Sequence, residues 1–262
     1  MAVNINMGLP YTEVVGIRVV EKSQYRNNSG EMGYVFELVF TNEEGEDHSF
    51  ISTPSLPVIY ANIDPMRSLS FTSPGKVNKT ISKDKAKYVV KLNVEESDPD
   101  FRSFILKCNE TLDKYYEENH LDEREIQSWN IQHPKKIGNG SVRPMALNMS
   151  CKAYSKLEDG THQAKRMGVY KIMDEKIIHC SSKKLIGCEV HASCSFRLLL
   201  GNHSGFQSTM MNDIILTKQL VRKEVNVTKS SFFKAFAGRT PERKKTNNDG
   251  SSSNSSSPNT EP

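Results

Sequence analysis

The sequence lacks a long apolar run, and its first residues lack the features of a secretory signal. No segment approaches the roughly 18 consecutive apolar residues of a membrane-spanning helix. The start of the chain, MAVNINMGLPYTEVVG, has neither a basic region nor a long apolar region. These absences argue against a membrane-spanning class, and we expect a soluble, intracellular protein without a membrane partner.

A large net charge is also absent, because 35 basic residues are nearly balanced by 31 acidic ones and leave a formal net charge of only +4 over 262 residues. The residues from position 229 onward hold six basic and three acidic side chains, which is +3, so the rest of the chain carries about +1. A protein with this balance binds nucleic acid only if its positive charge is concentrated on one face.

Familiar catalytic motifs are missing as well. The sequence contains neither a Gly-rich phosphate loop nor a Gly-x-Ser-x-Gly nucleophile elbow. The acidic residues between positions 98 and 125 have spacings that suit solvated helix faces. We therefore expect no enzymatic activity and no cofactor.

The cysteines are few and odd in number, at positions 108, 151, 180, 188 and 194. An odd count in a non-secreted chain predicts reduced thiols rather than a disulfide framework. Cys188, His191 and Cys194 come nearest to zinc-ligand spacing, but alternation along a strand directs His191 away from both cysteines. We expect core cysteines and no metal, and a zinc-dependent module is the alternative.

Alternating apolar residues predict strands in the first half of the chain, at 12–21, 33–41, 48–53, 67–72 and 88–94. Pro54 and Pro57 should end the third of these strands. The run Asp98-Pro99-Asp100 is typical of a helix start, and apolar residues at helical spacing extend that helix to about position 119. A second, short helix is predicted at about 122–129.

The second half is predicted to be mainly β. A basic loop at 133–140 precedes a long alternating strand at 143–156, a turn at 157–160, and short strands at 168–173 and 176–180. A hairpin of strands 185–200 and 210–220 closes the folded part around a Gly-rich turn. From about position 238 the Ser, Asn and Pro content predicts disorder.

These elements predict an α+β fold, mainly antiparallel β. The specific expectation is an OB-fold-like barrel with a helical insertion at about 98–130 and a disordered C-terminal tail. Residues 1–228 would form the nucleic-acid-binding domain, and residues 229–262 a basic and then Ser/Asn-rich flexible tail. Two β-rich halves on either side of the helices fit the pattern nearly as well.

Basic residues interleaved with aromatic residues are the main positive signal. Single-strand binding needs cations that follow the phosphates and exposed rings on which bases stack. Four stretches have this composition, and we predict nucleic-acid contacts from Arg18, Lys22, Tyr25 and Arg26; from Phe71, Lys76, Lys79, Lys83, Lys85, Lys87 and Tyr88; from Lys135, Lys136, Arg143, Lys152 and Tyr154; and from Lys165, Arg166 and Tyr170. The aromatic members are the stacking candidates, and the lysine-rich loop at 76–87 is the strongest cationic segment.

The order of features resembles a known family. The predicted helix is followed by Trp129, by VRPMAL at 142–147, by LIGCEV at 185–190 and by NDIIL at 212–216. This order is similar to that in the single-stranded-DNA-binding proteins of large double-stranded DNA viruses, over roughly residues 13–225. The resemblance implies an OB-fold with a helical insertion and a role in viral DNA replication, recombination or repair, in the host nucleus or at the viral replication site. The Ser/Asn-rich tail departs from the acidic tails with which many replicative single-strand binders recruit partners.

The working hypothesis is a non-enzymatic protein that binds single-stranded DNA independently of sequence and with strong salt dependence. Replication or recombination proteins and further copies of the chain are candidate partners. One alternative is an RNA-binding protein on the same scaffold. Another is a viral structural or host-interaction protein that docks through Phe232, Phe233 and Phe236.

Overall fold

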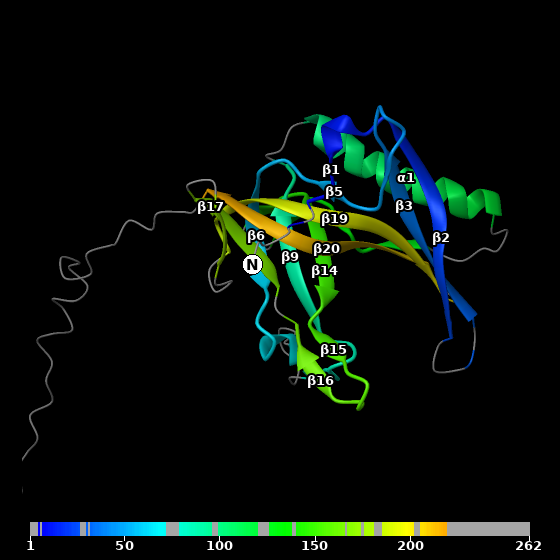
Figure 1. The fold of residues 1–262 in the computed structure, drawn as a ribbon. Helices are drawn as coiled ribbons and strands as arrows, with labels where there is room; N and C mark the ends of the chain where they lie inside the picture. The colour runs from blue at the N-terminus through cyan, green and yellow to red at the C-terminus, as the bar shows by residue number, and fades with distance from the viewer. Residues whose placement is uncertain are drawn as a thin grey trace, which may run out of the picture. The chain divides into compact units, whose positions relative to one another are not determined.

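The computed structural model describes residues 5, 7–26, 30, 32–71, 79–95, 99–119, 126–137, 140–165, 167–173, 176–180, 185–201 and 205–218. The side chains of residues 70, 71, 79 and 173 are not among what it describes. Within these residues the protein is mostly β-sheet with one α-helix (Figure 1). The sequence predicts the mainly β character and this helix. The predicted tail at 229–262 lies outside the described residues.

The first half of the chain supplies one edge and the centre of the large sheet. Its elements are β1 (Leu9–Pro10), η1 (Tyr11–Glu13), β2 (Gly16–Arg26), β3 (Met32–Thr41), β4 (Asp47–His48), β5 (Ile51–Ser52), β6 (Leu56–Asn62), η2 (Arg67–Leu69), β7 (Ser70–Phe71), β8 (Lys79–Thr80), β9 (Lys87–Asn93) and α1 (Pro99–Asn119).

The second half supplies the remaining strands. They are β10 (Ile126–Ser128), β11 (Ile131–Gln132), β12 (Lys135–Lys136), β13 (Val142–Arg143), β14 (Ala146–Lys152), β15 (Tyr154–Lys156), β16 (His162–Ala164), β17 (Gly168–Met173), β18 (Lys176–His179), β19 (Glu189–Leu200) and β20 (Gly205–Lys218).

Strand pairing in the large sheet runs β1–β5–β19–β6–β9–β14–β20–β17–β18, and β20 also pairs with β19. The pairings β19–β6–β9–β14–β20 therefore return to β19. In this ring only β14 and β20 run parallel, and the other neighbours are antiparallel. The β2–β3 hairpin extends the sheet, because β3 also pairs with the far end of β19.

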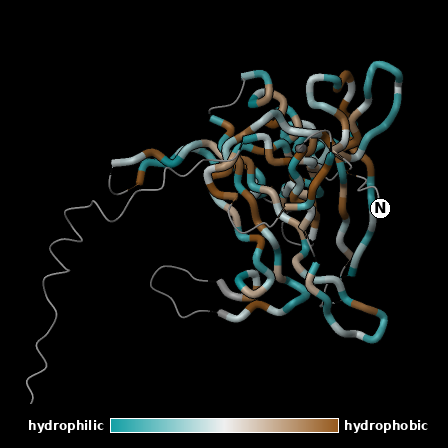
Figure 2. Tube along the Cα trace, turned by 60° about the vertical axis from the view of Figure 1, so that its left-hand side comes forward, coloured by the Kyte–Doolittle hydropathy of each residue, from teal (hydrophilic) through white to brown (hydrophobic). Residues whose placement is uncertain are grey.

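The core lies between α1 and the sheet. The helix buries Phe101, Ile105, Cys108 and Leu112 at the spacing that the sequence predicts. Aromatic rings fill the contact with β3 and β19, where Phe40 lies 5.9 Å from Phe104 and 6.3 Å from Phe196 between ring centroids. Figure 2 shows apolar segments gathered in the body and hydrophilic segments in the outlying turns.

Several sequence predictions need correction. Residues 122–125 of the predicted short helix at 122–129 lie outside the described residues, and residues 126–128 are not helical but form β10, which pairs with β20. A short isolated helix is only marginally stable, whereas the strand gains ladder hydrogen bonds to β20. Pro57 does not end a strand but lies inside β6, where Val58 N–H donates to Cys188 O at 2.8 Å. A proline near the start of a strand leaves the following ladder bonds intact.

Other segments are broken more finely than alternation indicates. The predicted strand 48–53 is split between β4 and β5, and the described residues 67–71 of the strand predicted at 67–72 form a 3-10 turn followed by β7. The basic loop at 133–140 contains β12, which pairs with β13 as a hairpin. The long strand at 143–156 is β13, β14 and β15 in succession. The helix and the strand at 168–173 are found as predicted. The closing hairpin is also present, but its first strand begins at Glu189 rather than at 185, and its second begins at Gly205 rather than at 210.

The five cysteines are free thiols. Cys188 and Cys194 are buried with the apolar residues of β19, while His191 faces the other way and its Nδ1 lies 2.8 Å from Thr53 O. Among the described residues, no three His, Cys, Asp or Glu side chains gather as they would around a metal ion. No helix in the described part of the chain has the length and apolar character to cross a membrane.

Candidate nucleic-acid interface

A row of side chains crosses the outer face of three neighbouring strands. Tyr60 on β6 is the cross-strand partner of Lys91 on β9, and Lys91 is the partner of Asn148 on β14. The intervening residues of β9, such as Val90 and Leu92, are fully buried on the inner face. Because a slip of one residue would expose that buried set, the apolar inner face fixes the register of the polar outer row.

Beside this row lies a groove of about 860 Å³. Among the described residues that line it, four are basic and none is acidic: Arg67, Lys85, Lys87 and Lys91. Tyr60, Val89 and Ile186 supply apolar surface, and 43% of Tyr60 is exposed. Cations beside an exposed ring are the combination that single-stranded nucleic acid requires.

Lys91 is at the centre of this arrangement. Its Nζ lies 5.8 Å from the centroid of the Tyr60 ring and donates to Gln132 Oε1 at 3.0 Å. Partial burial, followed by the charge of Arg143, lowers the pKa of Lys91 below its ordinary value. An anion placed here would relieve both effects, because it compensates an ammonium group that has lost part of its hydration.

Trp129 lies at the far end of the same row. Its ring centroid is 4.2 Å from that of Phe206, with the planes tilted by 33°, and 55% of the residue remains exposed. Its main-chain N–H donates to Gln207 O at 3.0 Å, and its carbonyl accepts from Asn148 Nδ2 at 3.1 Å. Tyr60 and Trp129 lie on opposite sides of the strip formed by β9 and β14, because Tyr60 belongs to β6, which pairs with β9, and the main chain of Trp129 bonds to β20, which pairs with β14.

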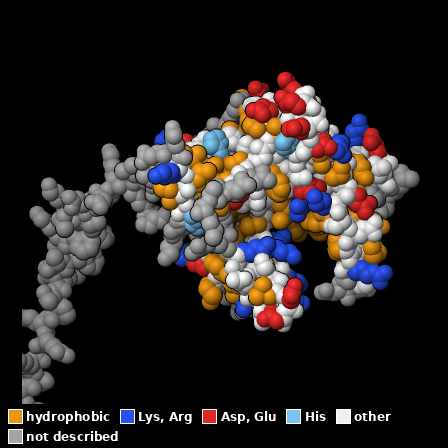
Figure 3. Space-filling model, in the orientation of Figure 1, with side chains coloured by type: hydrophobic (Ala, Val, Ile, Leu, Met, Phe, Trp, Pro, Cys, Tyr) orange, Lys and Arg blue, Asp and Glu red, His pale blue; other side chains and the backbone are white. Residues whose placement is uncertain are grey.

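The lysine-rich loop enters the interface at its C-terminal end. Lys83 Nζ lies 5.8 Å from the centroid of the Tyr154 ring. Asp84 Oδ1 lies 2.6 Å from His162 Nε2, so this part of the loop is attached to the β15–β16 hairpin. Figure 3 shows Lys and Arg side chains where the lobe of β15 and β16 joins the body of the sheet.

Two further predicted stretches approach the same strip. In the β12–β13 hairpin, Lys135 is the cross-strand partner of Arg143, and this hairpin leads directly into β14. Lys136 is exposed beside them. At the other end of β14, Lys152 is the partner of Lys87 on β9. Residues from the second and third stretches, far apart in sequence, are thus brought together by the β9–β14 pairing.

The fourth stretch forms a neighbouring pocket of about 340 Å³. Lys152, Lys165, Tyr170 and His179 line it, and the Tyr170 and His179 rings meet edge to face with centroids 5.5 Å apart. Burial, followed by the charge of Asp213, raises the pKa of Tyr170, so its phenol stays protonated. Because Lys152 lines this pocket and also pairs with Lys87 at the groove, the two sites adjoin.

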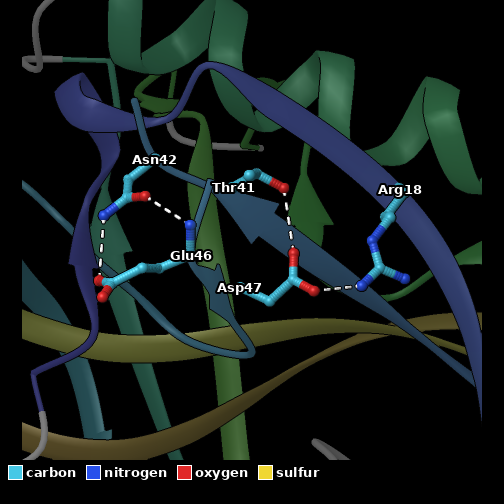
Figure 4. Close-up of polar contacts among 5 residues, drawn as sticks. All are labelled: Arg18, Thr41, Asn42, Glu46 and Asp47. Carbon is cyan, nitrogen blue, oxygen red and sulfur yellow. Dashed lines mark hydrogen bonds and ion pairs between the residues drawn. The ribbon is translucent and has the colours of Figure 1, made fainter. Parts of the chain in front are cut away.

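The first stretch lies elsewhere, on the edge strand β2. Arg18 is paired with Asp47, which also accepts from Thr41 Oγ1 at 3.2 Å (Figure 4). In the same turn, Asn42 Oδ1 accepts from the main-chain N–H of Glu46 at 2.8 Å. Arg18 therefore belongs to a local network that closes the β3–β4 turn.

Two of the other predicted residues of β2, Lys22 and Tyr25, are also engaged within the sheet. Lys22 Nζ lies 3.4 Å from the buried carboxylate of Glu37, which also accepts two hydrogen bonds from Arg197 at 2.9 and 3.0 Å. Tyr25 packs closely on Gly33, since a Cβ at Gly33 would lie 2.3 Å from the Tyr25 ring. Arg26 is exposed at the end of the strand. The first stretch is thus not brought together with the other three.

Two predicted stacking residues are buried. Tyr88 is 1% exposed, and its hydroxyl donates to Lys165 O at 2.7 Å. Tyr154 is 7% exposed, and its hydroxyl donates to Pro65 O at 3.0 Å. Both rings belong to the core in this structure and offer no face to a base, contrary to the prediction. Lys76, Arg166 and the side chains of Phe71 and Lys79 lie outside the described residues.

Sequence reasoning missed four residues of the interface: Tyr60, Arg67, Lys91 and Trp129 (quoted only as a landmark). The sequence does not identify Tyr60, because no strand is predicted between positions 53 and 67, where the structure has β6. Lys87, Val89 and Lys91 alternate in the sequence with Tyr88, Val90 and Leu92, which are buried. This alternation could have identified Lys91 as a residue of the outer face. Nothing local in the sequence shows that Trp129 lies beside β14, because that contact depends on long-range pairing.

No family model matches the sequence, and no curated protein matches it. Solved structures do show likeness. The single-stranded DNA binding protein gp2.5 of bacteriophage T7 is 14% identical over 67% of this chain and 96% of that chain, with a TM-score of 0.44. The single-stranded DNA-binding protein of bacteriophage Enc34 is 8% identical over 81% of this chain and 98% of that chain, with a TM-score of 0.39. The same Enc34 protein in complex with ssDNA is 8% identical over 77% of this chain and 96% of that chain, with a TM-score of 0.38. At such identities and TM-scores these likenesses carry no inference about function.

Proposed function

We propose that this protein binds single-stranded DNA without sequence preference, as a non-enzymatic component of DNA replication, recombination or repair. The binding face is the outer side of β6, β9 and β14. The viral setting within this proposal rests on the sequence resemblance described above.

One observation carries the proposal: the row formed by Tyr60, Lys91 and Asn148, with Trp129 at its far end. An exposed ring is present on each side of the β9–β14 strip, and a partly desolvated cation lies between them. Base stacking on such rings contributes about 1–3 kcal/mol per base and tolerates any base, because every base has a π-face. Sequence-specific binding needs hydrogen-bonding groups that read base edges, whereas rings and lysines contact any base and any phosphate. This row therefore favours sequence-independent binding.

In this proposal the phosphates of the bound strand lie along the basic side chains of the groove. Arg67, Lys85 and Lys87 lie along the groove beside Tyr60, and Lys152 continues the charge to the adjoining pocket. Single-stranded binding that neutralises Z phosphates weakens with salt with a slope of about −0.7Z. Engagement of the four groove cations therefore predicts a slope near −3.

The pairing order supports an OB-type barrel as part of the proposal. Numbered in chain order, the ring strands β6, β9, β14, β19 and β20 pair as 1–2–3–5–4–1. In an OB-fold, the face of strands 2 and 3 and the loop between strands 1 and 2 bind oligonucleotides. Here these are the β9–β14 face and the segment that contains the lysine-rich loop.

The proposal is tested by fluorescence anisotropy of a labelled oligothymidine at low and moderate salt. We expect tight binding at low salt, competition by unlabelled single strands but not by duplex, and a steep loss with added salt. A matched RNA oligomer in the same competition separates DNA from RNA preference. Absence of binding at low salt, or binding that is insensitive to salt, would overturn the proposal.

A further inference from the structure

Trp129 is connected to α1 by three buried amide side chains, which we call the amide cluster: Asn109, Asn130 and Gln207. Asn109 lies on α1, Asn130 directly follows Trp129, and Gln207 lies on β20. These residues are 8%, 0% and 1% exposed, respectively. Buried amides are costly unless they are hydrogen-bonded, so their partners define the conformation around them.

The cluster is densely bonded. Asn109 and Asn130 exchange two side-chain hydrogen bonds, of 2.6 and 3.2 Å. Ser128 Oγ accepts from Asn109 Nδ2 at 3.0 Å and donates to Asn130 Oδ1 at 2.9 Å. Gln207 Nε2 donates to Asn109 O at 3.1 Å and to Asp113 Oδ1 at 2.7 Å. The helix, β20 and the segment around Trp129 are therefore tied together at one point.

This bonding determines where the indole lies. Ser128 and Asn130, on either side of Trp129, both direct their side chains toward α1, and Trp129 instead packs on Phe206. Residues 129–130 connect β10, which pairs with β20, to β11, which pairs with β14. Their main chain is also held in place, because Asn148 N–H donates to Asn130 O at 2.7 Å. A buried network whose members are satisfied is rigid and specifies one arrangement.

We propose that the amide cluster is a positioning device that holds Trp129 in the orientation in which its free face receives a base. In this role α1 contributes to DNA binding as well as to the core, because Asn109 of the cluster lies on α1. The inference rests on the proposed function. Its physical basis is preorganisation: a ring already held in place loses little conformational freedom when a base stacks on it.

The test combines binding with the emission of Trp129, which is the single tryptophan of the chain. Trp129→Ala, Asn130→Ala and the double variant are compared for affinity to labelled oligothymidine. Trp129→Ala and Asn130→Ala should each weaken binding, by about tenfold for a lost stacking platform. The double variant should bind no more weakly than Trp129→Ala, because the amide acts only through the ring.

The spectroscopic readout separates positioning from general stability. In free Asn130→Ala, time-resolved anisotropy should show faster local motion of the indole, and acrylamide should quench it more strongly. Phe40→Leu is the control, since it weakens the core beneath β3 and should leave both signals unchanged. If Asn130→Ala does not fold, Asn109→Ala tests the same cluster from the helix side.

Additive effects of Asn130→Ala and Trp129→Ala, or unchanged indole motion in the folded amide variant, would overturn the positioning role alone. Failure of the proposed function gives a different result, because the wild-type protein itself would then not bind the labelled oligothymidine.

Discussion

Lys91 Nζ lies 5.8 Å from the centroid of the Tyr60 ring, and the two residues are cross-strand partners on β9 and β6. A cation and an exposed ring at one register position can contact a phosphate and a base of the same strand segment. This relationship, together with the exposed ring of Trp129 on the other side of the strip, is the basis of the predictions on binding that follow.

Removal of the Tyr60 ring should weaken binding to single-stranded DNA. Tyr60→Ala is expected to reduce affinity by about 1–3 kcal/mol, roughly 5- to 150-fold, because one base loses its stacking surface. Tyr60→Phe is the matched control and should bind nearly as the wild type, since it keeps the ring. Equal affinities of the alanine variant and the wild type, measured by anisotropy of labelled oligothymidine, would remove Tyr60 from the interface.

Lys91→Met should separate binding from stability. Loss of the charge should lower affinity and reduce the salt slope by about 0.7. Burial, followed by the charge of Arg143, lowers the pKa of Lys91 in the folded state, so the ammonium is disfavoured by folding. The methionine variant should therefore unfold at no lower denaturant concentration than the wild type at neutral pH. Any stability advantage should shrink as the pH rises through the folded pKa, and Lys91→Arg should retain the salt slope.

Two groove lysines should account for a defined part of the salt dependence. The double variant Lys85→Gln/Lys87→Gln is expected to reduce the slope of log affinity against log salt by about 1.4, that is 0.7 for each released phosphate contact. Lys107→Gln/Lys114→Gln, on the exposed face of α1, changes the net charge equally. If both pairs alter the slope to the same extent, net charge rather than the groove governs binding.

Asp113 should oppose folding at neutral pH. Burial raises the pKa of its carboxyl above the ordinary value for an aspartate, although the hydrogen bond from Gln207 acts in the other direction. The stability associated with a raised carboxyl pKa is present below the unfolded value and is lost as the pH rises through the folded one. Asp113→Asn should therefore raise the denaturant midpoint at pH 7, and the difference should vanish below about pH 3.8. Glu158→Gln, in an exposed turn, should show neither effect.

Arg197 and Glu37 form an ion pair in which Glu37 is buried and Arg197 is partly buried. Removing Arg197 alone should cost more stability than removing both residues. The Glu37 side chain is 2% exposed and accepts two hydrogen bonds from Arg197. Arg197→Met leaves this carboxylate with Lys22 at 3.4 Å as its remaining partner and should cost about 3–5 kcal/mol of unfolding free energy. The double variant Arg197→Met/Glu37→Leu should recover most of that loss in urea denaturation. A double variant as unstable as the single one would contradict this account.

The local elements of this protein follow from its sequence because they depend on residues close together in the chain. The Asp-Pro-Asp start and helical apolar spacing are sufficient for α1, and strict alternation is sufficient for β3, β9 and the closing hairpin. The same alternation separates the buried cysteines of β19 from His191. Composition also concentrates cations and rings in the segments that flank β9 and β14.

Only the tertiary structure decides which of those cations and rings share a surface. Tyr88 and Tyr154 match the sequence criterion as well as Tyr60 does, yet burial places them in the core. Arg18 and Lys22 are as basic as Lys87, but acidic partners on neighbouring strands engage them. Trp129 joins the candidate interface through pairing with β20 and through the amide cluster, contacts that span 19 to 98 positions along the chain. Sequence patterns specify the face on which a side chain emerges, whereas its neighbours across the sheet are set by long-range register.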